Sequence, residues 1–107
     1  MSKIALTYEN KEYVLEYSRQ SVRTMEAQGF VLNELETKPV TMIPMLYQGA
    51  FIKHHKGIKR NLMDEMYEEI ADKTGLLSAL MEMYAETLST LTDDKEDVGN
   101  ATWAMVK

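Results

Sequence analysis

The first seventeen residues alternate between apolar and polar positions. The apolar positions are Ile4, Leu6, Tyr8, Tyr13, Leu15 and Tyr17, and the opposite face, which can face water, carries Lys3, Thr7, Glu12 and Glu16. Because successive side chains of a strand point to opposite faces, this alternation predicts two strands joined by a turn at Glu9 and Asn10. Asn favours such a turn because it tolerates a positive φ. The pattern predicts an antiparallel β-hairpin over residues 3–17. The predicted pairs are Tyr8–Lys11, Leu6–Tyr13 and Ile4–Leu15.

Beyond the hairpin, apolar residues recur every three or four positions, which is the spacing of one face of an α-helix. This spacing predicts helices over about residues 18–28, 40–55, 61–71 and 75–91, with one further helical turn between 32 and 39. Ser18 or Ser21 can cap the first helix, and Gly29 can adopt the left-handed conformation that ends it, with Phe30 folding back. Pro44 lacks a backbone N–H, so we expect it in the first turn of the second helix.

The pattern changes after residue 91. Residues 92–100 are acidic and lack apolar periodicity, and an isolated apolar cluster of Trp103, Met105 and Val106 follows. We therefore expect a single compact domain over residues 1–91 and a flexible acidic tail over 92–107. Because an isolated two-stranded hairpin is marginal in water, helices must cover its apolar face. The predicted fold class is α+β: an N-terminal hairpin packed on a bundle of about four α-helices.

Composition narrows the possible chemistry. The chain has 107 residues, 45% of them hydrophobic, a formal net charge of −5 and no cysteine. A core can form, whereas disulfides, thiolate metal sites and cysteine nucleophiles are excluded. The apolar runs are far shorter than the roughly 20 residues that span a bilayer, and the N-terminus has no signal-peptide pattern. We expect a cytosolic protein without a membrane partner.

No catalytic constellation can be assembled from the residues present. His54 and His55 are neighbours, which in a helix point about 100° apart, so they cannot easily hold one metal ion together. Glu65, Glu68 and Glu69 fit the exposed face of a helix better than an acid–base pair in a cleft. The glycines are scattered singly, without a phosphate-binding loop motif. We therefore expect no enzyme, no metal site and no cofactor.

Methionine is the unusual component, with nine residues. Met suits both irregular cores and adaptable binding surfaces. The methionines concentrate on the three later predicted helices, where an apolar excess would form an exposed patch for a partner. We expect about half of the candidate residues to be buried and the others to form the binding surface. The candidates are Met42, Met45, Tyr47, Met63, Met66, Tyr67 and Met83.

A short basic run offers an alternative. Lys53, Lys56, Lys59 and Arg60 could bind nucleic acid, which would make the chain a small helical regulatory domain. The net acidic charge and the acidic helix that follows disfavour this reading, so we expect no nucleic-acid partner. The simpler interpretation of the basic run is a solvent-exposed connection between two helices.

The order of these features resembles a known family. The segments that carry the likeness are Leu6 to Arg19, Met25 to Phe30, Lys38-Pro39 leading to Gly49-Ala50-Phe51, and Met63 to Tyr67. Over roughly residues 4–91 the chain resembles small tail assembly chaperones of long-tailed phages and prophages of Gram-positive bacteria. The resemblance implies a non-enzymatic protein of the host cytoplasm that shields the hydrophobic tape measure protein and helps recruit tail tube subunits. It also implies a possible homo-oligomer.

Overall fold

The N-terminal hairpin forms with the predicted register. The computed structural model describes residues 2–93 and 101–106 of the chain. Strands β1 (Ile4–Tyr8) and β2 (Lys11–Leu15) are antiparallel, and Leu6 lies opposite Tyr13. Glu9 and Asn10 have φ values of 49° and 66°, as a two-residue turn between twisted strands requires. The predicted strand pairing is confirmed.

Helix α1 (Arg19–Ala27) begins and ends with local signals in the sequence. Ser18 caps its first turn by accepting a hydrogen bond from the Ser21 N–H, and the Ser21 side chain accepts one from the Ser18 N–H. At the other end Gly29 has a φ of 101°, and the Phe30 N–H donates to the Met25 carbonyl over 3.0 Å. Both ends of this helix match the prediction, and the capping residue is Ser18.

Helix α2 begins where it was predicted to begin, but it ends earlier and places Pro44 differently. A short 3₁₀ helix, η1 (Leu32–Glu34), precedes it, and α2 then spans Pro39–Gly49 rather than 40–55. Pro39 occupies the first helical position, so Pro44 lies inside the helix and not in its first turn. The missing N–H of Pro44 leaves the carbonyl of Val40 without a helical donor, at a residue that is 88% exposed to solvent.

The early end of α2 has a tertiary cause. Residues 50–54 form turns, in which the N–H of Ile52 donates to the Gly49 carbonyl. The carbonyl of Ala50 accepts the N–H of Glu16, 3.0 Å away, at the end of the hairpin. The α-helical continuation would have used that carbonyl within the helix. Pairing with the hairpin therefore takes the place of the last helical turn.

The remaining helices differ from their predicted bounds by two residues or less. Helix α3 spans Arg60–Glu69 and helix α4 spans Lys73–Ser89. Asp72 caps α4 by accepting the Gly75 N–H over 2.9 Å. The fold is α+β, with a hairpin followed by four α-helices in the described residues, as predicted.

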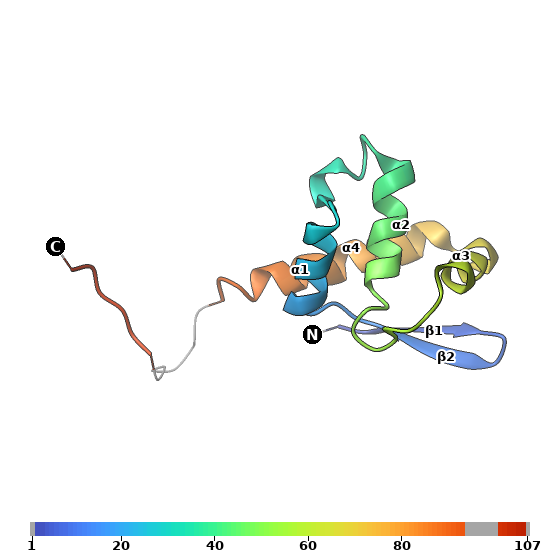
Figure 1. The fold of residues 1–107 in the computed structure, drawn as a ribbon, viewed down its shortest axis with the longest axis horizontal. Coiled ribbons are helices and arrows are strands. Elements are labelled where there is room, and N and C mark those ends of the chain that lie inside the picture. The colour runs from blue at the N-terminus through green and yellow to red at the C-terminus, as the bar shows by residue number, and fades with distance from the viewer. Residues whose placement is uncertain (1, 94–100, 107) are drawn as a thin grey trace.

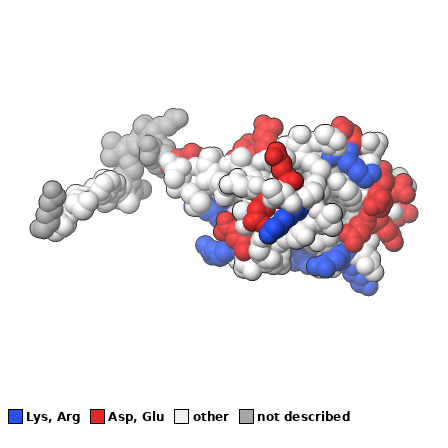
Figure 2. Space-filling view, turned by 90° about the horizontal axis from the view of Figure 1, so that it is seen from above, with Lys and Arg blue, Asp and Glu red and all other residues white. Residues whose placement is uncertain are grey.

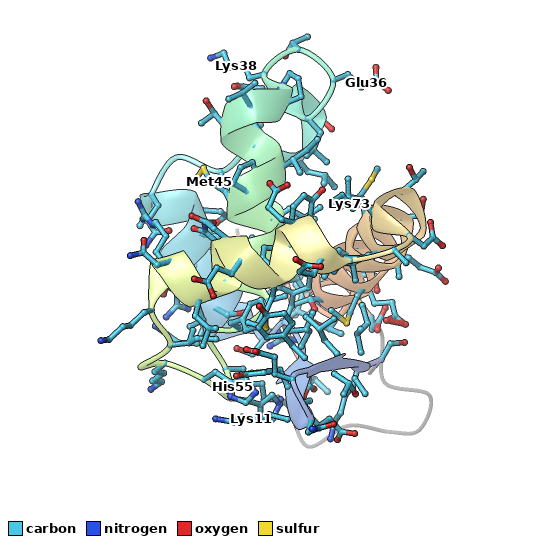
Figure 3. The ribbon with its side chains drawn as sticks, turned by 90° about the vertical axis from the view of Figure 1, so that its right-hand side faces the viewer. Lys11, Glu36, Lys38, Met45, His55 and Lys73 are labelled. Atoms are coloured by element: carbon cyan, nitrogen blue, oxygen red, sulfur yellow. The ribbon has the colours of Figure 1, made fainter. Side chains whose placement is uncertain are left out.

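The helices enclose one core that the hairpin closes on one side. Helix α4 runs across α1 and α2, which stand side by side, and the hairpin lies along the base of both (Figure 1). Viewed from the end, α3 crosses above the hairpin, with Met45 of α2 above α3 (Figure 3). The core draws on the hairpin and all four helices. Its largest fully buried apolar side chains are Tyr17, Tyr47, Phe51, Leu15, Met25, Leu46, Met66 and Leu80.

The predicted tail falls partly outside the described residues. Flexibility over 92–107 stays a prediction, because residues 94–100 and 107 are not among those described. Residues 101–106 form no helix or strand. In this segment Trp103, Met105 and Val106 are 86%, 76% and 92% exposed.

Candidate partner-binding surface

Most of the predicted methionine surface lies in the core. Five of the seven candidates are buried, namely Met42, Tyr47, Met63, Met66 and Met83. Met45 and Tyr67 are half-buried. About half of the candidates were expected to be buried, so burial goes further than predicted, and of the seven only Met45 and Tyr67 keep partly exposed side chains.

The buried candidates join helices to one another. The hydroxyl of Tyr47 donates to the carbonyl of Met63 over 2.9 Å, which links α2 to α3. The Tyr47 ring also meets the Tyr67 ring edge to face, with centroids 5.0 Å apart. Burial is the largest cause of the raised pKa of Tyr47. This group of aromatic and methionine side chains is a structural joint between α2 and α3.

An open surface with apolar lining lies between α1 and α4. Two adjoining hollows of about 210 and 430 Å³ share Glu26 and Leu88. We call this surface the α1–α4 groove. It is lined by Arg19, Val22, Arg23, Glu26, Phe30, Val31, Leu32, Asn33, Tyr84, Thr87, Leu88 and Leu91. Leu91 is 63% exposed and Val31 44% exposed, so apolar surface remains open at both ends.

Polar contacts fix one end of the α1–α4 groove. The guanidinium of Arg19 donates to the Thr90 carbonyl over 2.6 Å and to the Thr90 hydroxyl over 3.2 Å. The Thr90 hydroxyl in turn donates to the carbonyl of Thr87. These bonds tie the end of α4 to the beginning of α1. The groove is therefore held in place before any partner arrives.

A second hollow, of about 660 Å³, lies between α1, α2 and α3. We call it the basic hollow. Its lining comprises Gln28, Met45, Gln48, Gly49, Ile52, Lys56, Ile58, Arg60 and Met63. Lys56 and Arg60 supply positive charge beside the apolar side chains, and no Asp or Glu is among the lining residues. In Figure 2, Asp and Glu are densest at the end of the body farthest from the C-terminal segment, whereas Lys and Arg gather along the lower edge.

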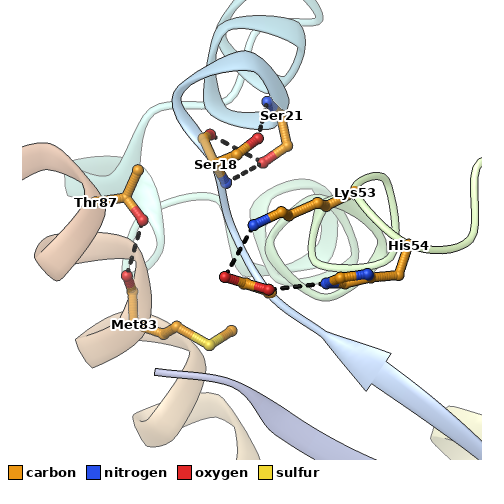
Figure 4. A network of polar contacts seen from close by, with 7 residues as sticks. Ser18, Ser21, Lys53, His54, Met83 and Thr87 are labelled. Carbon is orange, nitrogen blue, oxygen red and sulfur yellow. Dashed lines mark hydrogen bonds and ion pairs between the residues drawn. The ribbon is translucent and has the colours of Figure 1, made fainter. Parts of the chain in front are cut away.

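A buried carboxylate engages part of the basic run. Glu16 is only 4% exposed, with its carboxylate 2.8 Å from Nε2 of His54 and 3.0 Å from Nζ of Lys53 (Figure 4). The hydrogen bond from His54, followed by the Lys53 contacts, lowers the pKa of Glu16 against the opposing effect of burial. The cluster fastens the turn after α2 to the hairpin. Lys53 therefore holds an internal carboxylate rather than standing free beside Lys56.

The two histidines have separate roles. Nε2 of His55 accepts the N–H of Val14 over 3.0 Å, and its ring lies 5.3 Å from the Tyr13 ring. In Figure 3, His55 lies beside Lys11 of the hairpin. Burial, then the charges of His54 and Lys11, lower the pKa of His55. No group of three or more His, Cys, Asp or Glu side chains in the described part of the chain is placed to hold a metal ion.

The comparisons with known proteins place the chain in one family. The family described as a domain of unknown function, DUF5055, matches residues 1–106. Neither the curated proteins nor the solved structures gave a match. Over the described residues, no helix has the length and apolar character to cross a membrane. The chain belongs to the DUF5055 family.

Proposed function

We propose that this member of the DUF5055 family is a tail assembly chaperone that binds an apolar helical client through the α1–α4 groove. It acts by binding and not by catalysis. The observation that carries the proposal is the groove itself, an open apolar floor with Arg19, Arg23 and Glu26 beside it. Such a surface suits an amphipathic helix that lays its apolar face between two helices.

The client follows from the likeness of the sequence to small phage tail chaperones. We propose that it is the tape measure protein of the same phage, held in the host cytoplasm until tail tube subunits assemble around it. A long apolar helical chain needs its exposed surface covered before assembly, because large exposed apolar patches drive aggregation. The groove offers an apolar floor, and Arg19, Arg23 and Glu26 supply charges beside it. It therefore suits several segments of one long client.

Co-expression with the tape measure protein tests this proposal. The wild-type chain is expected to raise the soluble fraction of the client and to co-purify with it. Leu91→Asp places a charge in the groove at a residue that is 63% exposed, so the fold should survive while client recovery falls at least tenfold. Val40→Asp is the matched control, since Val40 is 88% exposed and lies outside the groove.

Two results would overturn the proposal. One is a wild-type chain that neither binds nor solubilises the client. The other is an equal loss of client recovery in Leu91→Asp and Val40→Asp, which would place the contact elsewhere. A tape measure gene directly downstream of the coding sequence would give independent support.

A further inference from the structure

The C-terminal segment, residues 101–106, presents an apolar cluster that is not buried against the described part of the chain. The side chains of Trp103, Met105 and Val106 are almost fully exposed, and the segment lies beyond the end of α4, away from the helical body (Figure 1). The sequence just before it, residues 93–97, contains four carboxylates and one lysine. An acidic stretch followed by an aromatic and apolar cluster is a pattern suited to docking on a surface that is both basic and apolar.

The basic hollow has the complementary composition. Met45, Ile52, Ile58 and Met63 supply apolar lining, whereas Lys56 and Arg60 supply positive charge. One carboxylate lies at the edge of the hollow, because Asp64 accepts a hydrogen bond from Nε2 of Gln48 over 3.2 Å, so the two cations still outnumber the carboxylates there. A volume of about 660 Å³ is in the range of sites that take a large aromatic side chain with its neighbours. The α1–α4 groove is a poorer match, because Glu26 lines both of its halves.

We propose that the basic hollow binds the C-terminal segment of a second copy of this chain, with Trp103 as the anchor. The occupant is a second copy because the segment makes no buried contact with its own body. The contact joins two different surfaces of the molecule, so it is head-to-tail and can extend to further copies. This inference does not depend on the proposed client, which occupies the other groove.

Trp103 reports the contact directly, because it is the only tryptophan in the chain. In a dilution series of the full chain, its emission is expected to lie at shorter wavelength when concentrated and to move to the wavelength of exposed tryptophan on dilution. Light scattering should show the mean mass falling over the same concentrations. The doubly reversed variant Lys56→Glu/Arg60→Glu is expected to weaken association at least tenfold. Lys3→Glu/Lys38→Glu makes the same charge change outside both the hollow and the α1–α4 groove and should associate like the wild type.

A mixing experiment tests the head-to-tail geometry. The Lys56→Glu/Arg60→Glu copy keeps its C-terminal segment, and a Trp103→Ser copy keeps its basic hollow. Each alone is expected to be monomeric, whereas the mixture should form a one-to-one pair of twice the mass. All tryptophan emission in that mixture comes from the first copy, and it should shift to shorter wavelength. Circular dichroism checks that each variant is folded. If Lys56→Glu/Arg60→Glu does not fold, Lys56→Gln/Arg60→Gln takes its place.

Several outcomes would overturn the proposal. A short-wavelength emission that does not change on dilution would place Trp103 on its own body. An emission typical of exposed tryptophan up to about 1 mM would mean that no docking occurs at useful affinity. Equal association in both charge-reversed variants would exclude the basic hollow. Displacement of the paired copy by duplex DNA, with binding lost in Lys56→Glu/Arg60→Glu, would make the hollow a nucleic-acid site instead.

Discussion

Helix α1 meets its two neighbouring helices in different ways. Towards α2 the Met25 side chain packs directly against the α2 backbone, because a Cβ atom at Gly49 would lie only 2.4 Å from Sδ of Met25. Towards α4 the contact passes through large side chains, including the Phe30 and Tyr84 rings with centroids 5.2 Å apart. The first contact is tightly packed where Met25 meets Gly49, beside the basic hollow, whereas the second leaves the α1–α4 groove open. Stability should therefore depend mainly on the α2 side and client binding on the α4 side.

The largest expected effect comes from filling the close contact. Gly49→Val places a branched side chain where Met25, which is 1% exposed, already packs. Overpacking of this kind is expected to lower the free energy of unfolding by about 3 kcal/mol, measured by urea denaturation followed by circular dichroism.

Gly57→Val is the matched control for that substitution. A Cβ at Gly57 meets nothing within 4 Å, so we expect a change within about 0.5 kcal/mol. Equal losses in the two variants would contradict the close contact and point to a general cost of replacing glycine.

Glu16→Gln is expected to lower the free energy of unfolding by about 2 kcal/mol at neutral pH, a smaller loss than that of Gly49→Val. The variant removes the charge that His54 and Lys53 bind, beside the same end of α2. Because the pKa of Glu16 in the folded chain lies below its ordinary value of 4.5, the carboxylate stabilises the fold above that pH. This contribution is lost as the pH falls through the lowered pKa, so the difference between variant and wild type should shrink in acid.

The matched control is Glu12→Gln, on an exposed position of the same strand, with an expected change within about 0.5 kcal/mol. Both proteins should also lose stability below about pH 6.5, because the pKa of His55 in the folded chain is lowered from 6.5 and its protonation favours unfolding. A constant difference between Glu16→Gln and wild type from pH 7 to pH 3 would count against the assigned pKa of Glu16.

The smallest expected effect on stability lies on the open side of α1. Leu88→Ala truncates a half-buried side chain shared by both halves of the α1–α4 groove. We expect the free energy of unfolding, measured by urea denaturation, to fall by about 1 kcal/mol. Recovery of the client should nevertheless fall several-fold. A stability loss as large as that of Gly49→Val would show that the α4 side is as tightly filled as the α2 side, and the contrast would fail.

Local features of the fold could be predicted from the sequence because their causes are local. The hairpin register follows from a two-residue period and a turn at Glu9 and Asn10, which both adopt positive φ. Ser18 and Gly29 similarly mark the ends of α1. The end of α2 could not be predicted, because it depends on a hydrogen bond between Ala50 and a residue far away in the sequence.

The candidate site was harder to predict for the same reason. Met63 and Met66 follow the helical period that marks a buried face, and that signal outweighed the adaptability of methionine. The α1–α4 groove depends on Val31 and Leu91, which lie at or beyond the ends of the periodic segments. Glu16 occupies the polar face of the hairpin pattern and is buried only because the turn after α2 covers it.

The place of α4 in the chain has a consequence for biosynthesis. The Tyr84 ring of α4 contacts both Tyr17 and Phe30, with centroids 5.4 and 5.2 Å away. Translation delivers this helix after the hairpin and the other three described helices, so those elements emerge from the ribosome with these rings uncovered. A message cut short before Lys73 would yield a product with an open core, which is a substrate for proteases and aggregation. Quality control of this protein therefore depends on the completion of helix α4.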